Sequence, residues 1–147
     1  MKNVKLYNVL FPLWMLMMFP ICWLIVLPGN FIIDSAVLFI SLYALKVPCK
    51  KDWYKKHILK IFLFGMISDV IGATFMLCMV LSEFAMMGDE LYITIPALVI
   101  SALFIFLFNY FITFRKEEKA LCLKLSLIFA IVTAPYTFLV PSSWIYA

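Results

Sequence analysis

The chain has 147 residues, of which 67% are hydrophobic and 14% are charged, with a formal net charge of +4. Soluble domains contain roughly 45–50% apolar and about 25% charged residues, so this composition excludes an ordinary soluble domain. The apolar residues come in runs near twenty long, the length that crosses a hydrocarbon core of about 30 Å. The sequence therefore predicts an integral membrane protein.

Five hydrophobic segments follow one another along the chain. They predict an all-α bundle of five transmembrane helices in a single domain, with spans at about residues 8–27, 29–46, 60–82, 92–114 and 121–140. We expect Pro28-Gly29 to form a tight turn between the first two spans, Pro48 to end the second, and Pro135 to kink the fifth. The connections are short, so no separate soluble domain is expected.

The basic residues lie in the N-terminal tail and in and beside two alternate connections. They are Lys2, Lys5, Lys46, Lys50, Lys51, Lys55, Lys56, Lys60, Arg115, Lys116, Lys119 and Lys124. Short loops rich in Lys and Arg stay on the cytoplasmic side, so we expect the N-terminus inside and the C-terminus outside. The same bias accounts for the net positive charge, so no nucleic-acid partner is expected.

The connection between the second and third spans is both basic and aromatic. Its residues Lys50, Lys51, Trp53, Lys55 and Lys56 are expected to contact anionic lipid headgroups at the inner face. Each Lys near an anionic leaflet contributes about 1 kcal/mol to binding. A docking surface for a cytosolic partner is the alternative. The single histidine of the chain, His57, is expected to be solvated at the same interface.

Polar and small residues form a stripe on four of the five predicted spans. The stripes are Asn30, Asp34 and Ser41; Gly65, Ser68, Asp69, Gly72 and Ala73; Thr94, Ser101 and Asn109; and Ser126, Ala130, Thr133 and Thr137. Lipid offers polar groups no partner, so these faces are expected to point into the bundle. For most of these residues, close packing of the helix backbones is the expected role.

Asp34 and Asp69 are the two acidic residues inside predicted spans. A charge at that depth costs several kcal/mol unless it is paired, protonated, hydrated or bound to a cation. The outer half of the predicted bundle has no Lys, Arg or His to pair with them. A structural role is the alternative: a protonated Asp69 bonds a neighbouring backbone, and Asp34 reaches the headgroups or caps its helix with Asn30.

Oxygen-bearing side chains of the other spans lie at a depth similar to that of the two aspartates. The candidate binding site is a polar layer in the outer half of the bundle, formed by Asp69, Asp34, Asn30, Ser101, Thr133 and Tyr136. In the leading hypothesis, Asp69 takes up and releases a proton or cation and Asp34 guards the outer access to it. The sequence then encodes a proton- or cation-linked transporter of small solutes, or a channel subunit.

No catalytic or cofactor motif is recognisable in the sequence. The four cysteines, Cys22, Cys49, Cys78 and Cys122, form no CxxC pair and have no metal-ligand spacing. We therefore expect no cofactor and no metal site, and we do not expect an enzyme. A membrane enzyme that acts on lipid is a distant alternative.

A non-catalytic role is the main alternative to transport. In that hypothesis the protein is a membrane subunit that scaffolds or regulates a larger complex. Five short spans enclose little space, so a homo-oligomer or a membrane-protein partner is expected in either case. The small size of the chain favours a bacterial plasma membrane as its location.

Overall fold

The computed structural model describes residues 20–82 and 91–139, and every secondary-structure element in these two ranges is helical. The elements are α2 (Pro20–Ala44), α3 (Lys50–Leu81), α4 (Leu91–Phe108), the π-helix η3 (Asn109–Thr113), α5 (Lys119–Val132) and the 3₁₀-helix η4 (Tyr136–Leu139). The all-α prediction is confirmed for this part of the chain. The predicted segment 8–19 of the first span lies outside the described residues.

Among the described residues, three helices are long and apolar enough to cross a membrane: Pro20–Ala44, Lys50–Met79 and Tyr92–Thr113. Helix α3 has 32 residues, which at about 1.5 Å per residue gives a length near 48 Å. A hydrocarbon core is only about 30 Å thick, so α3 is longer than is needed to cross one. The first turns of α3 carry Lys50, Lys51, Lys55 and Lys56, which identifies this end as the one outside the core.

Helix α2 runs through Pro28 and Gly29 without interruption, so the predicted turn between the first two spans is wrong. Gly29 has no positive φ, in agreement with its place inside the helix. Proline removes only one hydrogen bond from a helix, and transmembrane helices tolerate that loss. Helix α2 instead ends at Ala44, before Pro48, and Lys46 and Cys49 adopt positive φ angles of 52° in the turn that follows.

Helix α5 is shorter than its predicted span of residues 121–140. It has 14 residues, or about 21 Å of helix, and ends at Val132. Pro135 disfavours a helical conformation at Ala134 and cannot donate a hydrogen bond, which explains the break. The structure therefore has a break before Pro135 in place of the predicted kink, and the chain continues in the 3₁₀-helix η4 rather than in an α-helix.

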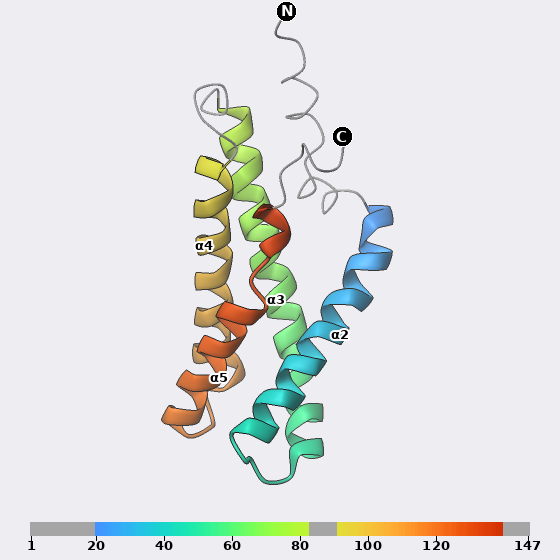
Figure 1. The fold of residues 1–147 in the computed structure, drawn as a ribbon, viewed down its shortest axis with the longest axis vertical. Coiled ribbons are helices and arrows are strands. Elements are labelled where there is room, and N and C mark those ends of the chain that lie inside the picture. The colour runs from blue at the N-terminus through green and yellow to red at the C-terminus, as the bar shows by residue number, and fades with distance from the viewer. Residues whose placement is uncertain (1–19, 83–90, 140–147) are drawn as a thin grey trace, which may run out of the picture.

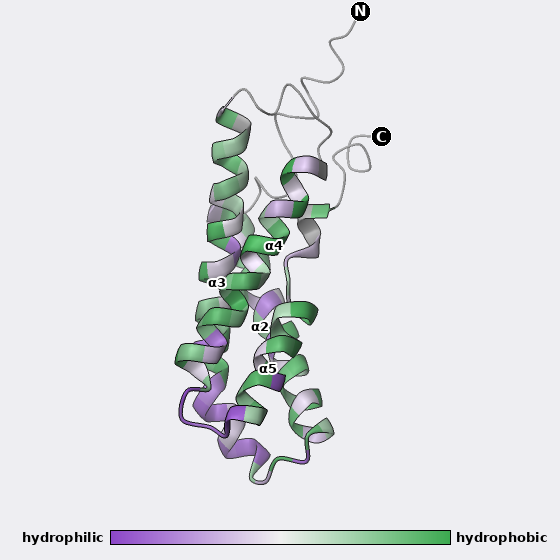
Figure 2. Cartoon of the chain, turned by 90° about the vertical axis from the view of Figure 1, so that its left-hand side faces the viewer, coloured by the Kyte–Doolittle hydropathy of each residue, from purple (hydrophilic) through white to green (hydrophobic). Residues whose placement is uncertain are grey.

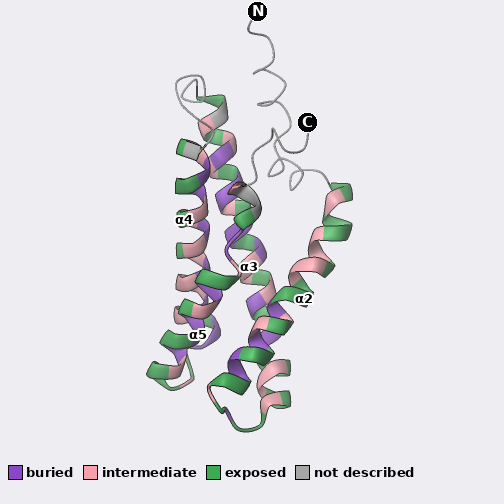
Figure 3. Cartoon of the chain, viewed as in Figure 1, coloured by how far each residue is buried: buried purple, intermediate pink, exposed green. Residues whose placement is uncertain are grey.

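Helix α4 packs against both α3 and α5, and α2 packs against α3 and also contacts α5, while its Pro20 end leans away from the bundle (Figure 1). The side chains of Ile21, Leu24 and Ile25 are accordingly 76–79% exposed, and buried residues gather where the helices meet (Figure 3). The apolar core contains Leu38, Leu42, Ile61, Ile105, Phe114, Leu125 and Phe129. Small side chains such as Ala73 and Ala97 let α3 and α4 approach closely.

Hydrophilic residues gather at one end of the bundle, where α2 connects to α3 and α4 connects to α5 (Figure 2). We call it the basic end. Its cationic residues are Lys46, Lys50, Lys51, Lys55, Lys56, Lys60, Arg115, Lys116, Lys119 and Lys124. These are all the Lys and Arg residues in the described ranges, so the apolar remainder of the bundle contains no permanent cation.

Candidate intramembrane carboxyl site

Four side chains from three helices form a polar cluster inside the bundle, which we call the carboxyl site: Asn30, Asp34, Asp69 and Ser101. Asn30 and Asp34 are one turn apart on α2, Asp69 lies on α3 and Ser101 on α4. Asp34, Asp69 and Ser101 have relative exposures of only 6%, 7% and 0%. The sequence-predicted stripes of these three helices therefore do face one another, and they bring two acids to one place.

Asp69 accepts hydrogen bonds at both of its carboxyl oxygens. Ser101 Oγ donates to Oδ1 at 3.1 Å, and Asn30 Nδ2 lies 3.5 Å from Oδ2. The same amide group of Asn30 also lies 3.2 Å from Met66 Sδ. Asp69 is therefore held by donors from two other helices, an arrangement that suits a carboxylate because an ionised carboxyl group can only accept.

Asp34 lies on the other side of the cluster, against the backbone of α3. A methyl group placed on Gly65 would lie 3.7 Å from Asp34 Oδ2, and Gly65 is one turn from Asp69 on α3. Glycine thus leaves room for the Asp34 carboxyl group beside the helix. Within residues 20–82 and 91–139, no side chain or backbone group donates a hydrogen bond to Asp34, so the two acids have different surroundings.

No cation from the described residues pairs with the carboxyl site. The two salt bridges among the described residues both involve Glu117, which lies at the basic end and not in the carboxyl site. In the described ranges, the part of the bundle away from the basic end contains no Lys or Arg, as the sequence indicates. Two acids share a buried site, and neither has an ionic partner among these residues.

Thr133 and Tyr136 are not part of this cluster, although the sequence placed them in the same polar layer. Thr133 Oγ1 donates to the carbonyl of Phe129 one turn earlier at 2.7 Å. Tyr136 donates its hydroxyl to the carbonyl of Ile131 and is half exposed. Both side chains satisfy their hydroxyl groups locally, as Ser and Thr hydroxyls in helices commonly do by bonding to a carbonyl one turn earlier.

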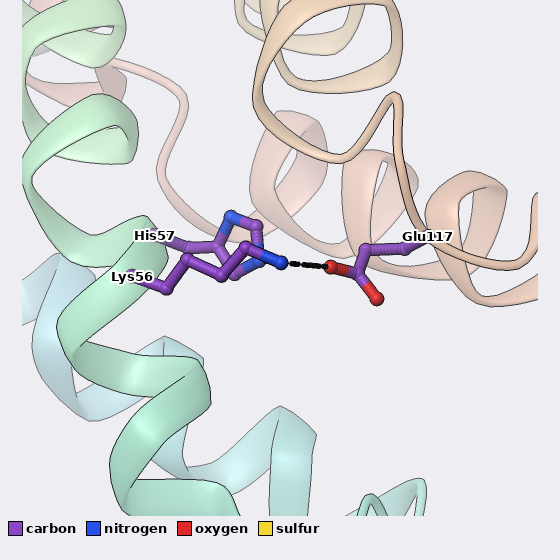
Figure 4. A network of polar contacts seen from close by, with 3 residues as sticks. All are labelled: Lys56, His57 and Glu117. Atoms are coloured by element: carbon purple, nitrogen blue, oxygen red, sulfur yellow. Dashed lines mark hydrogen bonds and ion pairs between the residues drawn. The ribbon is translucent and has the colours of Figure 1, made fainter.

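A second polar network links α3 to the connection before α5 at the basic end (Figure 4). Lys56 Nζ lies 3.0 Å from Glu117 Oε1, and His57 Nε2 lies 3.3 Å from the same oxygen. His57 is only 2% exposed and packs against Trp53 and Phe114, with ring centroids 4.4 and 5.4 Å away. The prediction of a solvated His57 is therefore wrong, because aromatic side chains cover its ring.

The hydrogen bond and the positive charge of Lys56 favour the ionised form of Glu117. Partial burial of the Glu117 carboxyl group favours its neutral form, but the hydrogen bond and positive charge of Lys56, with a smaller contribution from His57, outweigh that effect. The pKa of Glu117 is consequently lowered from its ordinary value of 4.5. Glu117 is thus an ionised acceptor for both partners at neutral pH.

The residues predicted to contact lipid headgroups fall into two groups. Lys51 and Lys55 are exposed at the basic end and free to reach a membrane surface. Lys50, by contrast, places its ammonium group 3.7 Å from the ring centroid of Tyr43, and Trp53 is half-buried against His57 and Phe114. Packing inside the bundle therefore takes up part of this predicted lipid surface.

Sequence reasoning did not identify Met66 or Glu117 as members of polar networks. Met66 is an apolar residue whose sulfur accepts a hydrogen bond only because the α2–α3 packing brings Asn30 to it. Glu117 is one of two adjacent glutamates in a charged connection, and no sequence pattern distinguishes it from Glu118. A pairing with Lys56, 61 positions earlier, depends on the fold.

The described residues contain no group of three or more His, Cys, Asp or Glu side chains placed to hold a metal ion. Among known proteins, no family model, no curated protein and no solved structure matches the chain. The chemistry of the carboxyl site is therefore the basis on which a function can be argued.

Proposed function

We propose that this protein is a proton- or cation-linked transporter of small solutes, or a channel subunit, in a bacterial plasma membrane. The observation that carries the proposal is the buried pair of Asp34 and Asp69, which has no cationic partner in the described part of the chain. An ionisable side chain inside a membrane is a functional candidate by default, because its burial opposes stability.

In the proposed topology the basic end of the bundle lies inside and its opposite end outside, and α2 is a single membrane-spanning helix in place of the predicted turn at Pro28-Gly29. The clustering of cations at one end of the described helices supports this orientation, since Lys and Arg residues remain on the cytoplasmic side. The basic end then faces the cytoplasm, and exposed residues such as Lys51 and Lys55 contact anionic lipid headgroups there.

The proposed mechanism follows from the different surroundings of the two acids. Asp69 receives donors from Ser101 and Asn30 and so retains its negative charge at lower cost. A second charge on the pair would cost about 2.5–3.5 kcal/mol in the membrane interior, so Asp34 and Asp69 together bind a proton or a small cation. Transfer of this ion between the pair and one side of the membrane would drive movement of the solute.

Flux measurements on purified protein in liposomes test the proposal. A pH-sensitive dye inside the vesicles reports proton entry under an imposed potential, and a parallel assay with Na⁺ tests a cation in place of the proton. Asp69→Asn keeps the size of the side chain, removes its charge and replaces one acceptor oxygen with an amide donor, so we expect it to abolish ion-dependent flux.

Asp52→Asn is the matched control, because Asp52 is an exposed acid in the first turn of the same helix, α3. It should conduct like the wild-type protein. Flux through Asp69→Asn equal to that of Asp52→Asn, in correctly folded protein, would overturn the proposal.

A scaffold or regulatory subunit remains the second candidate, and the exposed charges of the basic end favour it. This candidate requires a stoichiometric heterologous membrane protein after purification in mild detergent. A homo-oligomer, by contrast, is compatible with transport, because additional copies would enclose the space that a single small bundle lacks.

A further inference from the structure

The buried polar atoms without a hydrogen-bond partner all lie toward the basic end of the described structure. They are His57 Nδ1, Asn109 Oδ1, Asn109 Nδ2, Thr113 Oγ1 and Ser126 Oγ. Asn109, Thr113 and Ser126 have relative exposures of 1%, 3% and 0%. A buried polar group without a partner costs about 1–3 kcal/mol, so four side chains in one region require an explanation.

The local backbone is also irregular where these side chains occur. Asn109 and Thr113 are the first and last residues of η3, in which Phe114 N donates to Asn109 O at 2.9 Å across five residues. Cys122 Sγ of α5 donates to the carbonyl of Tyr110 at 3.3 Å. Single π-helical turns of this kind are frequent at functional sites. The thiol contact also places α5, and Ser126 one turn along it, against η3.

A cavity of about 370 Å³ opens beside this region at the basic end. Its lining residues are Tyr110, Phe111, Arg115, Glu117, Lys119 and Cys122. A bound water needs only about 10–15 Å³ of such space, together with two to four polar partners. Of the lining residues, Tyr110 is the neighbour of Asn109, Cys122 lies one turn before Ser126, and Glu117 connects the cavity to His57.

We propose that water enters the bundle from the basic end through this cavity and is bound by Asn109, Thr113 and Ser126. The buried face of α4 continues from Asn109 through Ile105 to Ser101, which holds Asp69. Ile105 is 2% exposed and separates the water from the carboxyl site as an apolar barrier. That this water is the inner access route to Asp69 rests on the proposed function. That water is bound at Asn109, Thr113 and Ser126 does not depend on it.

Cysteine labelling tests for the water directly. In a chain whose four native cysteines are replaced, Ser126→Cys introduces a thiol with little change in size. The matched control is Ala130→Cys, one turn further along the same buried face of α5 and beyond the proposed water site. A small, charged, membrane-impermeant methanethiosulfonate reagent is added to each side of the vesicles in turn.

We expect Ser126→Cys to react at least about tenfold faster than Ala130→Cys, and only from the basic end, because the reactive thiolate needs water. Equal rates at the two positions would overturn the inference. Thr113→Cys provides a second reporter on another helix if Ser126→Cys does not fold. Selective labelling combined with unchanged flux in Asp69→Asn would refute the transport proposal and leave the water site intact.

Discussion

At the scale of single residues, the two buried acids differ in what surrounds them. Asp69 has a donor for each oxygen, whereas Asp34 lies against the bare backbone of Gly65. An acid with donors retains its charge at lower cost than one without. The two acids of the carboxyl site therefore differ in the number of hydrogen-bond donors that surround them.

Gly65→Ala tests whether the space beside Asp34 is used. The added methyl group would lie 3.7 Å from Asp34 Oδ2, which is an ordinary contact, so we expect normal folding. The methyl group would occupy the space that a water molecule or cation needs next to this oxygen, so ion flux should fall several-fold. Gly29→Ala is the control, because nothing lies within 4 Å of the added atom. Equal flux in the two variants would show that the site does not use this face.

At the scale of elements, the spacing of polar residues predicted more than the spacing of prolines did. The stripes that contain Asp34, Asp69 and Ser101 face inward as expected, because lipid excludes unpaired polar groups. The predicted helix break at Pro28 was wrong. A proline restricts a helix only locally, and the surrounding packing determines whether the helix ends. The π-helical turn at Asn109 has no sequence signature, so its unpartnered side chains could not be foreseen.

The continuity of α2 can be checked by a distance measurement. Ile21 and Ala36 are both exposed and lie fifteen positions apart in this helix. An unbroken helix separates their Cα atoms by about 22 Å, at 1.5 Å per residue. A turn at Pro28-Gly29 would bring them to about 8–10 Å, the distance between packed helices. Spin labels at these two positions in lipid bilayers distinguish the two distances.

The link between α3 and the α4–α5 connection predicts a modest pH dependence. The pKa of Glu117 is lowered in the folded protein, so its stabilising effect is complete above the ordinary pKa of 4.5 and is lost as pH falls through the lowered value. Lys56 is more than half exposed, so Glu117→Gln should cost at most about 1 kcal/mol at neutral pH.

Unfolding of wild-type and Glu117→Gln protein in detergent, measured from neutral pH to below pH 4.5, checks the prediction. The difference in unfolding free energy should be constant above pH 4.5 and should shrink below it. Glu118→Gln is the control for the loss of one exposed negative charge. A difference that grows on acidification would exclude the assigned role of the Lys56–Glu117 pair.

At the scale of the whole molecule, charge and burial are separated along the helix axes. In the described ranges all permanent cations lie at the basic end, while two acids lie in the apolar interior without them. Composition and the distribution of Lys and Arg predicted this asymmetry, because both follow from the cost of charge in lipid. The depth at which the two acids meet depends on how three helices pack. The sequence indicated only which helix faces carry polar residues, and not where along the bundle these faces meet.

The central claim is that Asp34 and Asp69 together bind a proton or cation inside the membrane. Infrared difference spectroscopy of the protein in lipid measures this directly, because a protonated carboxyl group has a C=O band that shifts in deuterated water. We predict that the wild-type protein shows such a band, that alkali or a bound cation removes it, and that the Asp34→Asn/Asp69→Asn double variant lacks it. A wild-type spectrum without the band at any pH, or a band that persists in the double variant, would contradict the account.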